Sequence, residues 1–149
     1  MENINCYCDS SFDPSTHIAV VGWKIGDVIE FVLATKTTNT RAEITGLIET
    51  IIYLEPDLPY TIYTDCQSVL NRIKNKDKLI EKNFMNKKGI KLSNADLYQE
   101  LFALLQPNIK FEYIKGHLPS NQMNEHNMHF SQLDKLVRKE LRKYLRLDI

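Results

Sequence analysis

Hydrophobic residues occur at strand spacing in the first part of the chain. Three short stretches rich in β-branched and aromatic residues predict strands, at residues 4–9, 17–25 and 28–35. Gly26 and Asp27 lie between the second and third stretches and predict a tight hairpin turn. The polar segment 10–16, SSFDPST, predicts a turn after the first strand. The chain is therefore expected to begin with three strands in antiparallel order.

In the rest of the chain, helical and strand patterns alternate. Predicted helices span residues 41–54, 66–73, 93–106 and 130–146, and predicted strands surround Ile62 and span residues 109–114. In the first of these helices apolar residues recur at helical spacing, at Ile44, Leu47, Ile48, Ile51 and Ile52. The last strand places Ile109, Phe111 and Tyr113 in alternation with Lys110 and Glu112, as a half-buried strand does. This order of elements predicts an α/β fold with a mixed sheet flanked by helices.

Length and composition indicate one globular domain. We expect residues 1–149 to form a single domain, because the length suffices for one core and the 43% hydrophobic and 26% charged content is ordinary. No apolar run approaches the roughly 20 residues of a membrane helix. The first ten residues, MENINCYCDS, match neither a signal nor a transit peptide. Cys6, Cys8 and Cys66 have no second pair of zinc ligands and indicate reduced thiols. We therefore expect a cytoplasmic or nuclear monomer that is not secreted and binds no membrane.

The net charge is zero, but the charges are unevenly distributed. Residues 1–70 hold ten acidic and three basic residues, whereas residues 71–91 hold eight basic and two acidic ones. Residues 135–149 add six basic residues against two acidic ones. Lysine-rich segments are usually solvated surface, but an acidic half beside a basic segment also suits a metal-dependent enzyme that acts on nucleic acid.

Three carboxylates from separate elements are expected to meet. Asp9 and Asp65 each end a predicted strand, and a strand–helix–strand connection would make these strands parallel neighbours. Glu43 lies on the face of the first helix that must pack on the sheet. Two acids about 4 Å apart repel by roughly 4 kcal/mol at an effective dielectric of 20, and divalent cations such as Mg²⁺ offset such repulsion. Purely structural roles remain open: Asp65 as a helix N-cap, and Glu43 in a capping box with Thr40.

The sequence resembles type 1 ribonuclease H over nearly its full length. The matching segments are CDSS (8–11), TTNTRAEITGLIETI (37–51), YTDCQSVL (63–70), NADLYQEL (94–101), IKFEYIKGH (109–117) and LDKLVRK (133–139). This resemblance implies the ribonuclease H-like fold, a five-stranded mixed sheet with three antiparallel strands first and parallel strands afterwards. It also implies cleavage of the RNA strand of RNA–DNA hybrids with two Mg²⁺ ions, for which Mn²⁺ is a possible substitute.

The resemblance implies a set of catalytic residues. Asp9, Glu43 and Asp65 match three of the family's four metal-binding acids. Asp134 is preferred as the fourth acid, because DKLVRK matches the start of the family's last helix; Glu125 is the rival. In the family the fourth acid lies closer to the flexible histidine matched by His117, so we interpret residues 118–130 as an inserted loop. His117 is expected to assist proton transfer or product release, whereas a zinc site with His126 and His129 has no diagnostic spacing.

The resemblance also implies contacts to the substrate. Asn39 and Gln67 match positions that bind the hybrid, and Ser11 is a further candidate. Lys87 and Lys88 lie in the lysine-rich segment, where some members carry a basic handle that follows phosphates. That handle is usually also rich in tryptophan, but the only tryptophan of this chain, Trp23, lies elsewhere. Ordinary capping and turn roles are the alternative for the polar residues.

Two other functions remain possible on the sequence alone. A DNA exonuclease or an integrase-type enzyme could share the fold, but integrases carry their glutamate in a late helix, whereas Glu43 precedes Asp65. A non-catalytic module could bind hybrids without cutting them, but the presence of all four acids argues against it. A hybrid-cleavage assay with and without Mg²⁺ distinguishes these alternatives.

Overall fold

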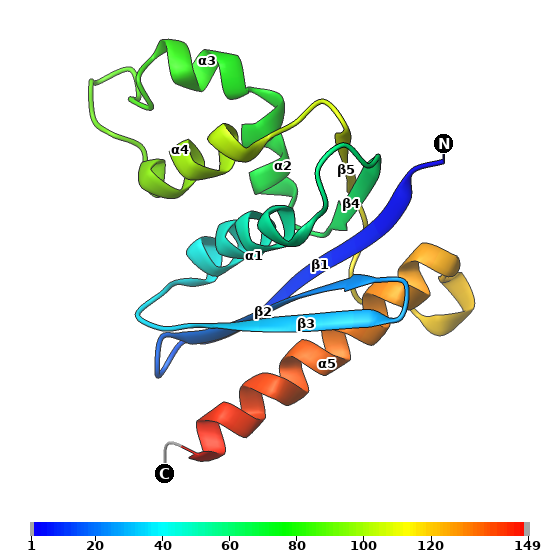
Figure 1. The fold of residues 1–149 in the computed structure, drawn as a ribbon. Coiled ribbons are helices and arrows are strands. Elements are labelled where there is room, and N and C mark those ends of the chain that lie inside the picture. The colour runs from blue at the N-terminus through cyan, green and yellow to red at the C-terminus, as the bar shows by residue number, and fades with distance from the viewer. Residues whose placement is uncertain (1, 148–149) are drawn as a thin grey trace.

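The computed structural model describes residues 2–147 as an α/β fold with one five-stranded sheet (Figure 1). The strands are β1 (Ile4–Asp13), β2 (Ile18–Ile25), β3 (Val28–Ala34), β4 (Tyr60–Thr64) and β5 (Ile109–Tyr113). The helices are α1 (Asn39–Tyr53), α2 (Gln67–Lys74), α3 (Lys76–Glu81), α4 (Ala95–Leu104) and α5 (Glu125–Leu147), with a short 3₁₀ turn at Ser120–Gln122. Within the described residues, no helix is both long and apolar enough to cross a membrane.

The sheet has the strand order β3-β2-β1-β4-β5. The first three strands pair antiparallel, and Gly26 at φ +59° and Asp27 form the tight turn between β2 and β3. β4 pairs parallel with β1, with Tyr63 opposite Tyr7, and β5 pairs parallel with β4. This topology confirms the predicted mixed sheet, with antiparallel strands first and parallel strands afterwards.

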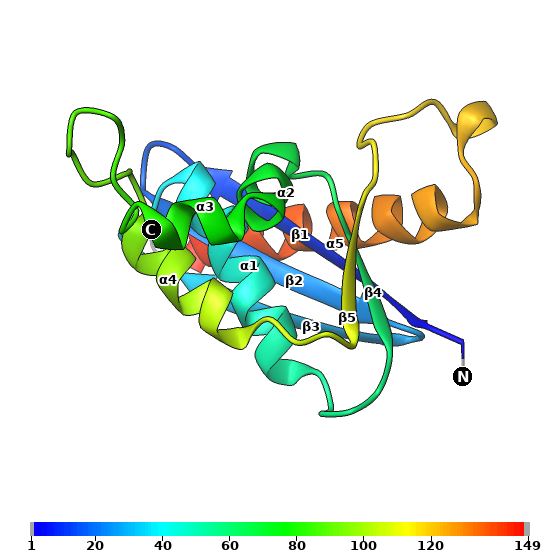
Figure 2. The same cartoon turned by 90° about the horizontal axis from the view of Figure 1, so that it is seen from above.

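Helices cover both faces of the sheet and enclose two cores. On one face α1 packs on β1 and β2 and α2 lies against β5, with α4 packed on α1 and α3 beside α2, while α5 crosses the other face (Figures 1 and 2). The larger core lies under α1 and includes Cys6, Cys8, Ile44, Leu47, Ile62 and Leu101. The second core lies under α5 and includes Tyr7, Val20, Phe130, Leu133 and Val137. The three cysteines are buried and free, as expected for reduced thiols.

Strand β1 is longer than its sequence pattern predicts. It continues past Asp9 to Asp13, because Ser10–Asp13 pairs with residues 18–21 of β2. The prediction of a turn over residues 10–16 is therefore wrong for its first half. The real turn follows Asp13, whose carboxylate accepts hydrogen bonds from Ser15 and Thr16.

Helix α5 begins five residues earlier than predicted. Asn124 and Asn127 each donate a backbone N–H to the other's side-chain oxygen, at 3.0 and 2.8 Å, which caps the helix N-terminus. Most of the segment interpreted as an inserted loop, residues 118–130, is therefore a 3₁₀ turn and the first turns of α5. Helix α3 was not predicted, and Tyr113, expected to be buried, is 49% exposed.

Candidate active site

The parallel pair β1 and β4 places two aspartates at one end of the sheet. The pairing of these strands ends at Tyr7 and Tyr63, and Asp9 and Asp65 each follow two residues later. Asp9 lies inside β1, where it pairs with Gly22 of β2 and is 7% exposed. Its buried Oδ2 atom has no hydrogen-bond partner, which is a costly arrangement for a carboxylate.

Helix α5 brings Asp134 to the same place from the other face of the sheet. The helix approaches β2 closely at Gly22, where a Cβ atom would lie 2.7 Å from Val137 Cγ1. Burial, the contact with Asp134 and the charge of Asp65 raise the pKa of Asp9 to about 9. Burial also opposes the ionisation of Asp134, but the Arg138 guanidinium and the contact with Asp9 outweigh it and lower its pKa. The pair therefore holds one proton, on Asp9, over the neutral range.

Asp65 lies between β4 and α2 and does not cap the helix. The N-cap residue of α2 is Cys66, which makes no capping hydrogen bond with its side chain. Burial and the charge of Asp134 raise the pKa of Asp65, while His117 opposes this shift. Gly116 lies against the carboxylate: a Cβ atom at this position would be 3.0 Å from Asp65 Oδ2. A side chain at position 116 would therefore push the Asp65 carboxylate away by a few tenths of an ångström.

Glu43 faces the same group of acids from α1. The predicted capping box with Thr40 does not form, because α1 begins at Asn39 with Thr38 as its N-cap. Asn39 Nδ2 instead donates to Glu43 Oε1 at 3.1 Å. Burial and the charge of Asp65 raise the pKa of Glu43, and a hydrogen bond from the Cys66 thiol partly offsets this. Asp9, Asp65 and Asp134 thus lie within electrostatic reach of one another, and Glu43 joins the group through Asp65.

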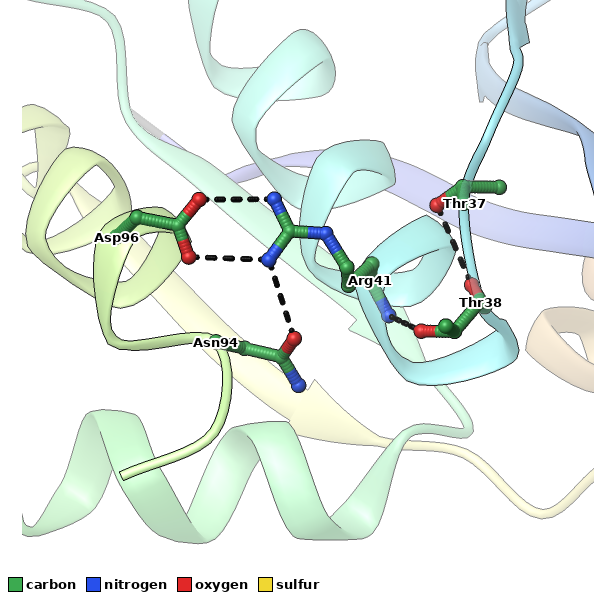
Figure 3. A network of polar contacts seen from close by, with 5 residues as sticks. All are labelled: Thr37, Thr38, Arg41, Asn94 and Asp96. Atoms are coloured by element: carbon green, nitrogen blue, oxygen red, sulfur yellow. Dashed lines mark hydrogen bonds and ion pairs between the residues drawn. The ribbon is translucent and has the colours of Figure 1, made fainter. Parts of the chain in front are cut away.

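An ion pair between α1 and α4 holds the start of α1 in place (Figure 3). Arg41 binds both carboxylate oxygens of Asp96, at 3.0 and 2.8 Å, and also donates to Asn94 Oδ1 at 3.2 Å. Thr38 Oγ1 accepts from the Arg41 backbone N–H. The arginine lowers the pKa of Asp96 to about 2. The sequence did not predict this ion pair, which supports the start of α1, where Asn39 and Glu43 lie.

A pocket of about 420 Å³ opens beside the carboxylates. His117 lines it, with φ +58° and with Nδ1 3.5 Å from Arg138 Nη2. Lys115 and Lys135 add positive charge to its wall, next to Asp134. The rival fourth acid, Glu125, lies elsewhere: its side chain is 86% exposed and faces His129 at the start of α5. The geometry therefore favours Asp134 as the fourth member of the group.

The predicted substrate-binding residues lie on several elements, three of them close in sequence to the acids and two in a separate basic loop. Asn39 and Gln67 are exposed at the starts of α1 and α2, and Ser11 is half-buried on β1. Lys87 and Lys88 are exposed on the loop between α3 and α4. Lys87 lines a second pocket of about 500 Å³ together with Arg72, Lys78 and Lys82. In the sequence these residues were visible only as members of a basic segment.

The four acids suit a hard divalent cation in their chemistry. Among residues 2–147, no three His, Cys, Asp or Glu side chains are placed so that they could hold one metal ion together. In this arrangement Asp134 is paired with Arg138 and Glu43 with Asn39. Carboxylate oxygens are nevertheless the ligands that Mg²⁺ and Mn²⁺ prefer, and the buried Oδ2 atom of Asp9 has no hydrogen-bond partner among the described residues. In its chemistry the donor set therefore suits such ions.

Comparisons with known proteins agree on one family. A family model described as RNase H matches residues 1–142. A ribonuclease H of Caldicellulosiruptor saccharolyticus is 36% identical over 84 residues, which are 54% of this chain and 58% of the relative. One of Cupriavidus pinatubonensis is 38% identical over 85 residues, 54% of this chain and 57% of the relative. The chain thus spans a little over half the length of the curated relatives it matches.

Solved structures share the fold at low sequence identity. The solution structure of the PFV RNase H domain superposes with a TM-score of 0.76 at 20% identity, over 92% of this chain and 93% of that one. The foamy viral protease-reverse transcriptase in complex with dsDNA gives a TM-score of 0.73 at 17% identity, over 91% of this chain and 92% of that one. These likenesses establish the ribonuclease H-like fold.

Proposed function

The chain belongs to the RNase H family, and on this premise we propose that it hydrolyses the RNA strand of RNA–DNA hybrids. The observation that carries the proposal is the convergence of Asp9 on β1, Asp65 just after β4 and Asp134 on α5, with Glu43 of α1 beside Asp65. Structural needs alone do not explain a buried carboxylate with an orphaned oxygen beside two further acids.

We propose that these four acids hold Mg²⁺, with Mn²⁺ as a substitute. When bound, a pair of such ions supplies an activated water for in-line attack on a phosphodiester and neutralises the leaving 3′ oxygen. Asp9 would have to release its proton to hold a cation, and the positive charge of the cation would favour the ionised carboxylate that burial and the neighbouring acids disfavour. If Asp134 held the ion, the Arg138 guanidinium, which lines the pocket, would be available for a phosphate.

His117 is proposed to move a proton near the leaving group. It lines the pocket beside Asp134 and Arg138, in a left-handed loop conformation that presents its ring to the pocket. Lys115 and Lys135 in the same wall attract the scissile phosphate and its neighbours. The imidazole can then protonate the departing oxygen or assist release of the product.

Hybrid recognition is proposed to follow from polar groups around the acids. Asn39, Gln67 and Ser11 can form hydrogen bonds with the sugars of the RNA strand. Their 2′-hydroxyl groups are what distinguishes RNA from DNA. In this proposal the basic pocket lined by Lys87, and by basic residues of α2 and α3, binds phosphates of the hybrid at a greater distance from the cleaved bond. The foamy viral neighbour in complex with dsDNA supports a nucleic-acid partner.

One gel assay with a labelled RNA–DNA hybrid tests the proposal. With Mg²⁺ or Mn²⁺ the chain should cut the RNA strand, EDTA should stop the cleavage, and Asp65→Asn should be inactive. The matched control is Asp27→Asn, which makes the same change in the exposed β2–β3 turn and should keep full activity. Preferential digestion of DNA, or hybrid binding in EDTA without turnover in Mg²⁺, would refute the proposed activity.

A further inference from the structure

The first turns of α5 rest on a cluster of polar aromatic side chains from two strands. Tyr7 of β1 and Tyr63 of β4 stack on each other with ring centroids 5.2 Å apart. His126 of α5 stacks on Tyr63 at 4.5 Å, and His129 stacks on Tyr7 at 5.2 Å. The Tyr7 hydroxyl lies 2.7 Å from His126 Nδ1, and the Tyr63 hydroxyl lies 3.4 Å from His126 Nε2. Both ring nitrogens of His126 are therefore occupied by β-sheet side chains.

A buried lysine joins the same cluster from β2. Lys24 is 5% exposed, and its Nζ donates to His129 Nδ1 at 2.7 Å and to Gln132 Oε1 at 2.6 Å. A buried ammonium group is costly unless its N–H groups find acceptors, and both of these acceptors are on α5. The lysine therefore stabilises the fold only when the helix lies in this position.

The cluster connects the three elements that carry the buried and half-buried aspartates. Tyr7 precedes Asp9 by two residues on β1. Tyr63 of β4 likewise precedes Asp65, which directly follows that strand, by two residues. His126 and His129 lie one to two turns before Asp134 on α5. A rotation or shift of α5 that broke these contacts would also move Asp134 away from Asp9.

We propose that His126 and His129, with Tyr7, Tyr63 and Lys24, form a latch that positions Asp134 against Asp9 and Asp65. The inference rests on the proposed function, because it assigns these residues a part in assembling that site. The apolar contacts of Phe130, Leu133 and Val137 begin one turn after the start of α5, so they leave its first turn to the polar aromatic cluster. Hydrogen bonds require a fixed direction between donor and acceptor, so they define the position of the helix start on the sheet.

Amide hydrogen exchange in EDTA tests the latch without any reference to activity. In the double variant His126→Ala with His129→Ala, amides of residues 125–134 should exchange about 10- to 100-fold faster than in the parent chain, because the helix start opens locally. Met128→Ala is the matched control, since Met128 lies between the two histidines on α5 and is 62% exposed. His126→Phe keeps the stacking on Tyr63 without the hydrogen bonds and should give an intermediate rate. Exchange in the double variant equal to that of the Met128 control would overturn the proposal.

Kinetics separate positioning from general structural support. The double variant should lose about 10- to 100-fold in kcat with KM within twofold, as expected for a misplaced catalytic group. A rise in KM with kcat unchanged would refute the latch. Failure of the parent chain to cut hybrids would refute the proposed function instead, and the exchange result would still stand.

Discussion

Replacing Asp9 by asparagine should stabilise the metal-free protein. In the folded chain the Asp9 carboxyl keeps its proton up to about pH 9, whereas in the unfolded chain it ionises near its ordinary pKa of 3.8. Because the folded pKa is raised, stability is greatest below pH 3.8 and falls as the pH rises towards 9. Asparagine has nearly the same shape and no charge, so it removes this penalty.

The size of the effect follows from the same shift. Each pH unit above the unfolded pKa costs about 1.4 kcal/mol, so that at pH 7 the penalty amounts to at most about 4 kcal/mol. Relaxation of the surrounding groups lowers this figure, and we expect Asp9→Asn to gain about 2–4 kcal/mol in EDTA at neutral pH. For a domain of this size, each kcal/mol raises Tm by about 2–4 °C. The gain should shrink as the pH falls and vanish near pH 4.

Thermal and urea unfolding in EDTA, followed from pH 4 to 9, measure this gain directly. Asp27→Asn serves as the control, because it removes an exposed carboxylate from the β2–β3 turn and should change Tm by less than about 2 °C. Mg²⁺ should then stabilise the parent chain more than Asp9→Asn, since only the former keeps the full set of ligands. An Asp9→Asn protein no more stable than the parent at pH 7, or a gain independent of pH, would refute the account of this buried carboxyl.

Three further results are expected. Gly116→Ala should lower kcat at least about tenfold, with little change in Tm, because its Cβ would lie 3.0 Å from Asp65 Oδ2; unchanged kinetics would show that Asp65 can move freely. Asp96→Asn should cost at most about 1 kcal/mol in urea unfolding, since the pair with Arg41 is partly exposed. Its contribution should persist above pH 3.8 and disappear as the pH falls through about 2, where Asp96 takes up its proton. Lys87→Ala should weaken hybrid binding and reduce the slope of log K against log salt by about one, and an unchanged slope would exclude Lys87 from phosphate contact.

The local signals in the sequence were strong enough to predict most of the sheet. The Gly26-Asp27 turn, the helical spacing in α1 and the strand that leads into Asp65 each depend on neighbouring residues alone, and the structure confirms all three. Strand β1 was predicted too short, because its polar second half is held by pairing with β2 and not by its own apolar residues. Pairing of this kind is a tertiary effect that a short window of sequence does not contain.

In the candidate site, too, some contacts could be predicted from the sequence and others depend on the packing of separate elements. Asp9 and Asp65 could be brought together from the sequence, because parallel neighbouring strands end at the same edge of the sheet. The close approach of Gly116 to Asp65 and the ion pair of Arg41 with Asp96 could not, because each joins elements whose positions only the packed layers determine. The pairs Asp134–Arg138 and Asn39–Glu43 each join residues four apart on one helix, so the spacing that allows these contacts was present in the sequence.

The long spacing between His117 and Asp134 now has a structural reason. Read from the sequence it indicated an inserted loop, but residues 125–130 of that segment form the first turns of α5. Helical turns that carry polar residues on their inner face would lift from the sheet unless that face found partners. His126, His129 and Gln132 find them in Tyr7, Tyr63 and Lys24. The first turns of α5 and the polar residues on the sheet are therefore parts of one arrangement, and the helix that carries Asp134 is held at both its apolar middle and its polar start.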